Sequence, residues 1–326
     1  MVSWMDDQRP SGRARPVSRR DLLKYAAMLA PFAQSAVTWA KERPPEVAFT
    51  FDDPKTEEGA GLSWQEINDR MLAALEKHRI KAVLFVTGKR VDSAAGRSLV
   101  AAWNNAGHAI ANHSYSHPFF NNADVALTQF ESDVLKNEPL IHHYRHFVEL
   151  FRFPYFKEGD TAEKRNGMRD FLAQHGYRIG RATIDASDWA ISWRLEKRVS
   201  SDRKTNTVPY GEFFKQHIWE RARYYDSLAH RVLDHQIRHT ILLHHNALNA
   251  LFLDQLIEMF ANKGWKPINA VDAYGDPVYD LQPKILPAGE SLVWALAKET
   301  GRFESELRYP GEDDVYENPK MDALGL

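Results

Sequence analysis

The sequence contains no cysteine and no strong excess of one charge. Without cysteine, the 326-residue chain has no disulfide, thiolate zinc site or cysteine nucleophile, so His, Asp or Glu must hold any metal. The 42 basic and 44 acidic residues nearly cancel, so neither nucleic acid, an anionic membrane surface nor an integral membrane partner is implied. The 44% hydrophobic content is ample for a buried core.

The N-terminal residues 1–40 are typical of an export signal rather than of a folded domain. Ser18-Arg19-Arg20 opens a segment that continues through Leu22 and Leu23 into a weakly polar run, which is too short to span a membrane with certainty. Paired arginines before such a run resemble a twin-arginine signal, which would place the mature protein in the periplasm. An uncleaved membrane anchor and a plain amphipathic helix are the alternatives.

From about residue 44 to residue 275, apolar strand-like runs alternate with helical patterns, which predicts right-handed βαβ units and a parallel sheet. No Gly-x-Gly-x-x-Gly follows the first strand, so a barrel fits better than a Rossmann sheet. We expect strands at 47–53, 81–87, 108–112, 147–153, 177–184, 240–244 and 266–269, and helices at 62–78, 97–105, 123–143, 161–175 and 251–262.

Two segments depart from this alternation. Residues 191–238 form a charged, aromatic insertion, in which the periodicity predicts mainly one long helix from about Tyr210 to Gln236. Its aromatic stripe favours packing, although it could also cover a groove. The main domain would thus occupy residues 41–276, followed by a C-terminal extension at 277–326. In the extension we expect a helix at 291–299 and then loop or extended chain from Arg302.

The first predicted strand ends in two adjacent carboxylates, Asp52 and Asp53, followed by Pro54. The carboxyl ends of strands carry the chemistry of barrel enzymes. Because successive strand residues point to opposite sides, the two carboxylates can face the same way only if the strand ends between them, which frees one for a metal and one for another task. The alternative is an ordinary solvated turn.

The third predicted strand runs into His113 and His117. Histidines four apart lie on one face of a helical turn and can bind one cation together. These two lie at a strand end in the same layer as Asp53, and one carboxylate with two imidazoles leaves coordination positions open, as in catalytic sites.

Further strand ends carry polar residues whose ordinary interpretation is a capped turn or a solvated strand exit. Arg152 could pair with Asp52 and lower its pKa, and the backbone N–H of Tyr155 could stabilise an oxyanion. His244 is well placed as a proton donor if Asp188 fixes its tautomer and raises its pKa. Chance accounts much less well for five strand ends that carry compatible catalytic residue types together than for any single one of them.

The ordered set Thr-Phe-Asp-Asp at 50–53, His-x-x-x-His at 113–117, Arg-x-Pro-Tyr at 152–155, Asp-Trp at 188–189 and Leu-x-His at 242–244 resembles the polysaccharide deacetylases. These form carbohydrate esterase family four, the NodB-homology domain. The resemblance covers roughly residues 44–275 and implies a distorted (β/α)7 barrel, here with a helical insertion and a C-terminal extension.

The resemblance implies that Asp53, His113 and His117 bind a divalent metal, usually zinc with cobalt or nickel as substitutes. Asp52 would be the general base and His244 the general acid, with Arg152 tethering the base and Asp188 orienting the acid. Trp189 and Leu242 would wall the pocket for the acetyl methyl group. The implied reaction is hydrolysis of N-acetyl groups on an amino-sugar glycan.

Two departures from the family pattern concern the rim of the groove. Pro54 and Lys55 replace the usual glycine after the aspartates, and His245 stands where aspartate is frequent. They bear on substrate identity more than on reaction type. A related C–N hydrolase of a non-sugar amide or imide is one alternative, and an inactive glycan-binding envelope protein is another.

Overall fold

The strand that ends in the paired aspartates, β1 (Glu46–Asp52), is the centre of the sheet. In the computed structural model, which describes residues 43–308 and 314–326, β1 pairs in parallel with β7 (Arg238–His244) over its whole length and with β2 (Val83–Val86) at its carboxyl end. The export signal predicted at residues 1–40 lies outside the described residues.

The main sheet is parallel throughout, in the order β6-β4-β3-β2-β1-β7, and β8 pairs beside the start of β1. A second, antiparallel pair joins β5 to β9. The remaining strands are β3 (Ala109–Asn112), β4 (Phe147–Phe151), β5 (Lys157–Gly159), β6 (Arg178–Ile179), β8 (Lys266–Pro267) and β9 (Ala288–Gly289).

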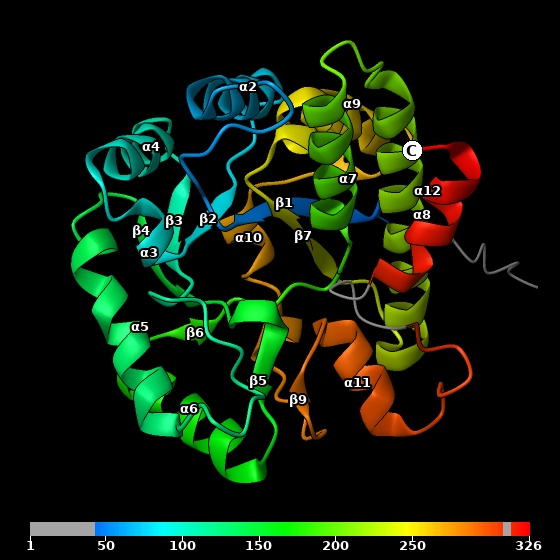
Figure 1. Cartoon of the computed structure of the whole chain (residues 1–326). Helices are drawn as coiled ribbons and strands as arrows, with labels where there is room; N and C mark the ends of the chain where they lie inside the picture. The colour runs from blue at the N-terminus through cyan, green and yellow to red at the C-terminus, as the bar shows by residue number, and fades with distance from the viewer. Residues whose placement is uncertain (1–42, 309–313) are drawn as a thin grey trace, which may run out of the picture. The chain divides into compact units, whose positions relative to one another are not determined.

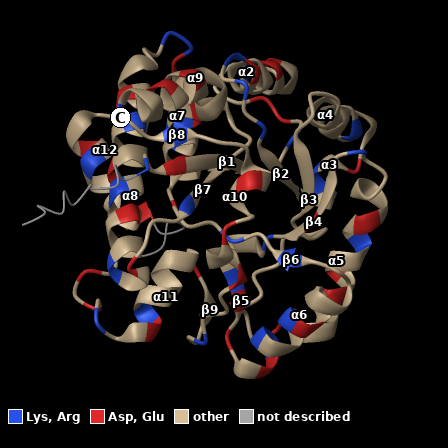
Figure 2. Ribbon diagram, turned by 180° about the vertical axis from the view of Figure 1, so that it is seen from behind, with Lys and Arg blue, Asp and Glu red and all other residues tan. Residues whose placement is uncertain are grey.

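Helices surround the strands, with α2, α4 and α5 on the flank of β2 to β4 and α7 to α9 on the flank of β1 and β7 (Figure 1). Acidic and basic positions are interspersed along outer helices such as α5, α6 and α8 (Figure 2). The helices are α2 (Trp64–Lys77), α3 (Gly88–Val91), α4 (Ala94–Asn105), α5 (Leu127–Ile141), α6 (Ala162–Gln174), α7 (Asp188–Ser201), α8 (Val208–Leu233), α9 (Ala247–Asn262), α10 (Ala270–Ala273), α11 (Leu292–Thr300) and α12 (Asn318–Leu324).

The sheet curls into a distorted barrel, as the family resemblance implies and in agreement with the predicted alternation. The chain after β6 crosses from β4 to β7, where Ile184 forms a parallel bridge with Ile241. The predicted strand 177–184 is therefore interrupted, and only β6 and the bridge at Ile184 remain. Between them, the carbonyl of Gly180 accepts a hydrogen bond from the Arg152 side chain. A Cβ atom at Gly180 would lie 2.6 Å from the Phe85 ring, so only glycine allows this close approach.

Strand alternation sets which side chains face the site. Phe49 packs edge-on against Phe260 of α9, and Phe51 packs against Trp103 of α4, so these rings belong to the layer between sheet and helices. Thr50 and Asp52 consequently face the barrel interior. The sequence pattern of β1 thus delivers a carboxylate to the inside of the barrel at the strand's last residue.

The insertion contains two helices rather than one. The long helix predicted from about Tyr210 is α8, and its aromatic residues Tyr210, Phe214 and Tyr225 are buried, as the packing interpretation requires. Helix α7 was not predicted. Its start at Asp188 follows a strand-like run directly, without a proline or a strong capping pattern to announce it.

Part of the C-terminal extension is helical, which corrects the expectation of a loop from Arg302 onward. Helix α12 begins with a proline in its first turn, and Met321 is fully buried. Arg194 of α7 donates hydrogen bonds to Asn318 and Asp322 of this helix. A short helix with one apolar anchor carries too little periodicity to be found from sequence.

No helix within residues 43–308 and 314–326 has the length and apolar character needed to cross a membrane.

We expect Met321→Ala to lower the free energy of unfolding by about 2–4 kcal/mol, because it removes a buried side chain and leaves a cavity under α12. The matched control is Leu324→Ala on the same helix, where the side chain is 64% exposed and the expected change is below about 0.5 kcal/mol. Urea unfolding of both variants measures the difference. Equal stability of the two variants would show that α12 does not depend on this anchor.

Candidate active site

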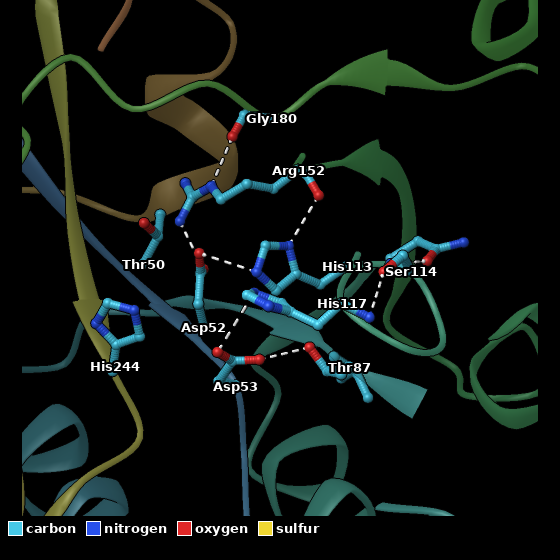
Figure 3. A network of polar contacts seen from close by, with 12 residues as sticks. Thr50, Asp52, Asp53, Thr87, His113, Ser114, His117, Arg152, Gly180 and His244 are labelled. Carbon is cyan, nitrogen blue, oxygen red and sulfur yellow. Dashed lines mark hydrogen bonds and ion pairs between the residues drawn. The ribbon is translucent and has the colours of Figure 1, made fainter. Parts of the chain in front are cut away.

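The two aspartates line the same cavity because β1 ends between them. Asp52 is the last strand residue and is 3% exposed, whereas Asp53 leaves the strand geometry with a positive φ of +57°. Figure 3 shows Asp52 between Arg152 and His113, and Asp53 turned toward Thr87 and His117. The strand-end geometry expected from the sequence is present.

Asp53, His113 and His117 bring one ligand atom each to within 4.8 Å of one another. The Nε2 atom of His117 lies 3.5 Å from Oδ2 of Asp53, and the two imidazole rings are 4.9 Å apart between centroids. Nδ1 of His113 lies 2.8 Å from the carbonyl of Arg152, which can only accept, so this nitrogen carries the proton and Nε2 keeps its lone pair.

This donor set fits a divalent cation. One carboxylate and two imidazoles are a common set for zinc, and the hydrogen bond behind His113 fixes its tautomer for ligation. Burial lowers the pKa of both histidines, which favours the neutral form that a metal needs. Burial opposes ionisation of Asp53, but His117, His113 and Arg90 outweigh it and hold the pKa of Asp53 well below its usual range.

The loop from His113 to His117 is not a helical turn, so the geometric reason given by the sequence spacing was wrong. Ser114 and His117 have positive φ values of +64° and +59°. The side chain of Asn112 accepts a hydrogen bond from the Ser114 N–H, and Ser114 Oγ accepts one from the His117 N–H. These local bonds form tight turns that bring the two imidazoles together by another route.

The Arg152 side chain links three parts of the site. Its Nη1 donates to Oδ1 of Asp52 at 2.6 Å, its Nε to the carbonyl of Gly180 at 2.8 Å, and its Nη2 to the hydroxyl of Tyr274 at 2.9 Å. The guanidinium lies 3.9 Å from the centre of the Phe85 ring. The predicted pairing with Asp52 is therefore present and fully buried.

Arg152 acts to lower the pKa of Asp52, as expected, but the net shift of this pKa is upward. Burial raises the pKa of Asp52 to about 6, although Arg152 and His244 both act to lower it. Desolvation of the carboxylate is the larger effect here because the group is almost completely removed from water. Asp52 is ionised at neutral pH, and it is a stronger proton acceptor than an exposed aspartate.

His244 lies at the end of β7 and pairs with Asp188. Its Nδ1 is 2.7 Å from Oδ1 of Asp188, and its backbone N–H donates to Oδ2 of the same carboxylate. Burial alone would lower the pKa of His244, but Asp188 outweighs it and raises the pKa to about 9. The predicted pairing is present, with Asp188 in the first turn of α7 instead of in a turn before it.

Sequence reasoning missed the residues that hold Asp188 and Arg152 in place. Asn246 and Asn249 donate side-chain hydrogen bonds to Asp188 at 2.9 and 2.7 Å. Asn246 is also the N-cap of α9, so an asparagine after a strand-end histidine was a usable signal. Tyr274, which contacts Arg152, follows α10 and has no sequence signal of its own.

A cavity of about 590 Å³ lies over these groups. Arg152 and Asp188 lie behind its wall and do not line it. The backbone N–H of Tyr155 has no hydrogen-bond partner among the described residues, and its ring lies 4.5 Å from that of His117. The predicted site residues that line the cavity are Asp52, Asp53, His113, His117, Tyr155, Trp189, Leu242 and His244.

Comparison with known proteins gives a family match for the first part of the chain. Residues 40–180 match the family described as polysaccharide deacetylase. The peptidoglycan-N-acetylglucosamine deacetylase of Bacillus cereus is 31% identical over 164 residues, which are 50% of this chain and 50% of that protein. The chain therefore spans about half the length of the curated relative it matches.

Similar solved structures have lower identity. A family 4 carbohydrate esterase from Streptomyces lividans in complex with acetate is 22% identical, with a TM-score of 0.45 over 68% of this chain and 91% of that one. A polysaccharide deacetylase from Bacillus cereus is 20% identical, with a TM-score of 0.49 over 68% and 90%. A CE4 family pseudoenzyme from Bacillus anthracis is 19% identical, with a TM-score of 0.49 over 71% and 65%.

We expect Arg152→Met to lower the free energy of unfolding by about 3–5 kcal/mol at pH 8, because it leaves the Asp52 carboxylate buried without a partner. The loss should be smaller at pH 5. The folded pKa of Asp52 is above its unfolded value, so its contribution is present at low pH and is lost as pH rises through the folded pKa. Removing the guanidinium raises that pKa further.

Urea unfolding at both pH values, with a chelator present, measures the loss without any contribution from metal binding. In the double variant Arg152→Met, Asp52→Asn, neither charge of this pair is left, so the pH dependence that comes from Asp52 should disappear. An equal loss at pH 5 and pH 8 in the single variant would contradict the role assigned to the ion pair.

Proposed function

We propose, from the premise that residues 40–180 belong to the polysaccharide deacetylase family, that this protein is a metal-dependent hydrolase that removes N-acetyl groups from an amino-sugar glycan. One observation supports the proposal above all. Asp53, His113 and His117 converge on one side of a cavity that also holds the Asp52 carboxylate and the His244 imidazole.

Asp53, His113 and His117 would hold the cation, and their nitrogen and oxygen donors suit zinc, with cobalt or nickel as substitutes. A bound cation would polarise the acetyl carbonyl and acidify a water molecule. The three residues are ready for this role because His113 is already oriented by the Arg152 carbonyl. A cation held by these three side chains would have coordination positions left for water and substrate.

Asp52 acts as the general base and accepts the proton of the attacking water. Arg152 keeps this carboxylate in place and Tyr274 supports the guanidinium from behind. His244 is charged at neutral pH and acts as the general acid, giving its Nε2 proton to the leaving amine while Nδ1 remains bonded to Asp188. The C–N bond breaks, and the products are acetate and a free amine.

The remaining cavity residues bind the acetyl group. The backbone N–H of Tyr155 donates to the oxyanion that forms at the former carbonyl. Trp189 and Leu242 supply apolar surface for the acetyl methyl group. The arrangement places apolar walls beside one acid and one base, whose pKa values lie on opposite sides of neutrality.

The relative from Bacillus cereus is named for peptidoglycan N-acetylglucosamine, and we propose a glycan of that chemical class as the substrate. Such a substrate lies outside the cytoplasmic membrane, which agrees with the twin-arginine pattern at Ser18-Arg19-Arg20. Release of acetate from N-acetylglucosamine oligomers by the metal-loaded protein tests the proposal. Hydrolysis of only small non-sugar amides or imides would favour the alternative C–N hydrolase.

We expect Asp52→Asn to keep its metal and to lower kcat by roughly 10²- to 10⁴-fold, since the base is lost but no ligand is. Asp53→Ala and His117→Ala should lose the metal as well as activity. Metal content after gel filtration and acetate release measure the two effects separately. The control is His143→Ala, a histidine that neither lines the cavity nor belongs to the ligand set. Full activity of Asp52→Asn would exclude Asp52 as the base.

We expect kcat/KM to fall at alkaline pH as His244 loses its proton, near its pKa of about 9. In Asp188→Asn the carboxylate that raises this pKa is gone and burial lowers it. The alkaline limb should therefore move to lower pH by at least about one unit. A pH profile of both proteins at fixed metal concentration measures the shift, and an alkaline limb that stays in place would argue against His244 as the acid.

A further inference from the structure

One side of α7 faces the cavity and the other is packed into the core. The residues of α7 that line the cavity are spaced three or four apart, so they lie on one face of the helix. The core side is apolar and consists of Ile191, Leu195 and Val199. The cavity side consists of Trp189, Ser192, Trp193 and Glu196.

Trp193 is unusual among the aromatic residues of the insertion because it is 59% exposed. Tyr210, Phe214 and Tyr225 of α8 are at most 2% exposed, so packing accounts for them and not for Trp193. Lys197 lies 5.1 Å from the centre of the indole, which covers part of one ring face. A large apolar ring kept in water at the edge of a cavity is a ready contact surface for a ligand.

Glu196 lies one turn further along the same helix face. Its Oε1 accepts a hydrogen bond from Ser192 Oγ at 2.9 Å, and no described Lys, Arg or His pairs with it. A carboxylate held in this way has acceptor positions left for hydroxyl groups. An aromatic face beside a fixed acceptor matches a pyranose ring, which has apolar C–H groups on its faces and hydroxyls at its edge.

We propose that Trp193 and Glu196 form a second sugar-binding subsite, in which the ring next to the acetylated sugar stacks on the indole and donates hydroxyl hydrogen bonds to Glu196. This inference rests on the proposed function, since it takes the acetylated sugar to lie at Asp53, His113 and His117. The substrate is then an oligosaccharide or polymer, and a single amino sugar fills only part of the cavity.

The test compares acetate release from N-acetylglucosamine with release from its β-1,4-linked tetramer, using the zinc-loaded full chain. For the wild type, kcat/KM should be higher for the tetramer. Trp193→Ala should lower the ratio of the tetramer value to the monomer value by about 10-fold. Trp193→Phe keeps an aromatic face and should recover part of the ratio.

The matched control is Val208→Ala, which truncates an apolar side chain that is 58% exposed at the start of α8, away from the cavity. This variant should keep the wild-type ratio. Thermal unfolding should show native stability for all three variants, because the altered side chains are largely in water. A ratio unchanged in Trp193→Ala, or no preference for the tetramer in the wild type, would overturn the subsite.

A separate measurement distinguishes failure of the subsite from failure of the proposed function. If the zinc-loaded wild type releases no acetate from either sugar, the deacetylase proposal fails. Calorimetric titration of the tetramer into wild type and Trp193→Ala then decides the subsite alone. Binding that weakens in the variant supports it, whereas equal binding or no binding at all rejects it.

Discussion

The site depends on the buried ion pair between Arg152 and Asp52. This guanidinium bonds to the last residue of β1, to the backbone of Gly180 and to Tyr274, while the carbonyl of Arg152 orients His113. Burying two charges costs several kcal/mol for each before their attraction is counted. The pair is therefore poor evidence for stability, and its geometry agrees with a need to hold the proposed base, Asp52, and the proposed metal ligand, His113, in place together.

Asp52 and His244, which lie side by side at the ends of the paired strands β1 and β7, show how the effects of burial and of ion pairing on a pKa compete. For Asp52, one guanidinium does not compensate for the loss of water, so its pKa rises. For His244, the carboxylate of Asp188, supported by Asn246 and Asn249, is stronger than the loss of water, so its pKa also rises. The shift of His244 keeps its imidazole protonated at neutral pH, as the proposed general acid requires. The shift of Asp52 makes the carboxylate a stronger proton acceptor while its pKa, about 6, still leaves it mostly ionised at neutral pH.

Much of this arrangement follows from sequence because strand ends are readable. The run ending at Asp52 and Asp53 places one carboxylate inside the barrel, and its parallel neighbours bring His113 and His244 to the same edge. The turns after those ends were not predictable, since hydrogen bonds of single side chains such as Asn112 decide them. The direction of the Asp52 pKa shift could not be predicted from the sequence either, because it depends on how fully the folded structure removes the carboxylate from water.

The backbone conformation at the rim of the cavity is energetically unfavourable. Asp53, Ser114, His117 and Tyr155 all have positive φ values, which are unfavourable for residues with a Cβ atom by roughly 1–2 kcal/mol each. For Asp53, Ser114 and His117 the side-chain contacts, and not the backbone preference, account for the residue present. Glycine or asparagine at these positions would relieve that backbone cost and stabilise the fold, but at Asp53 and His117 it would remove the side chains that form the candidate metal site.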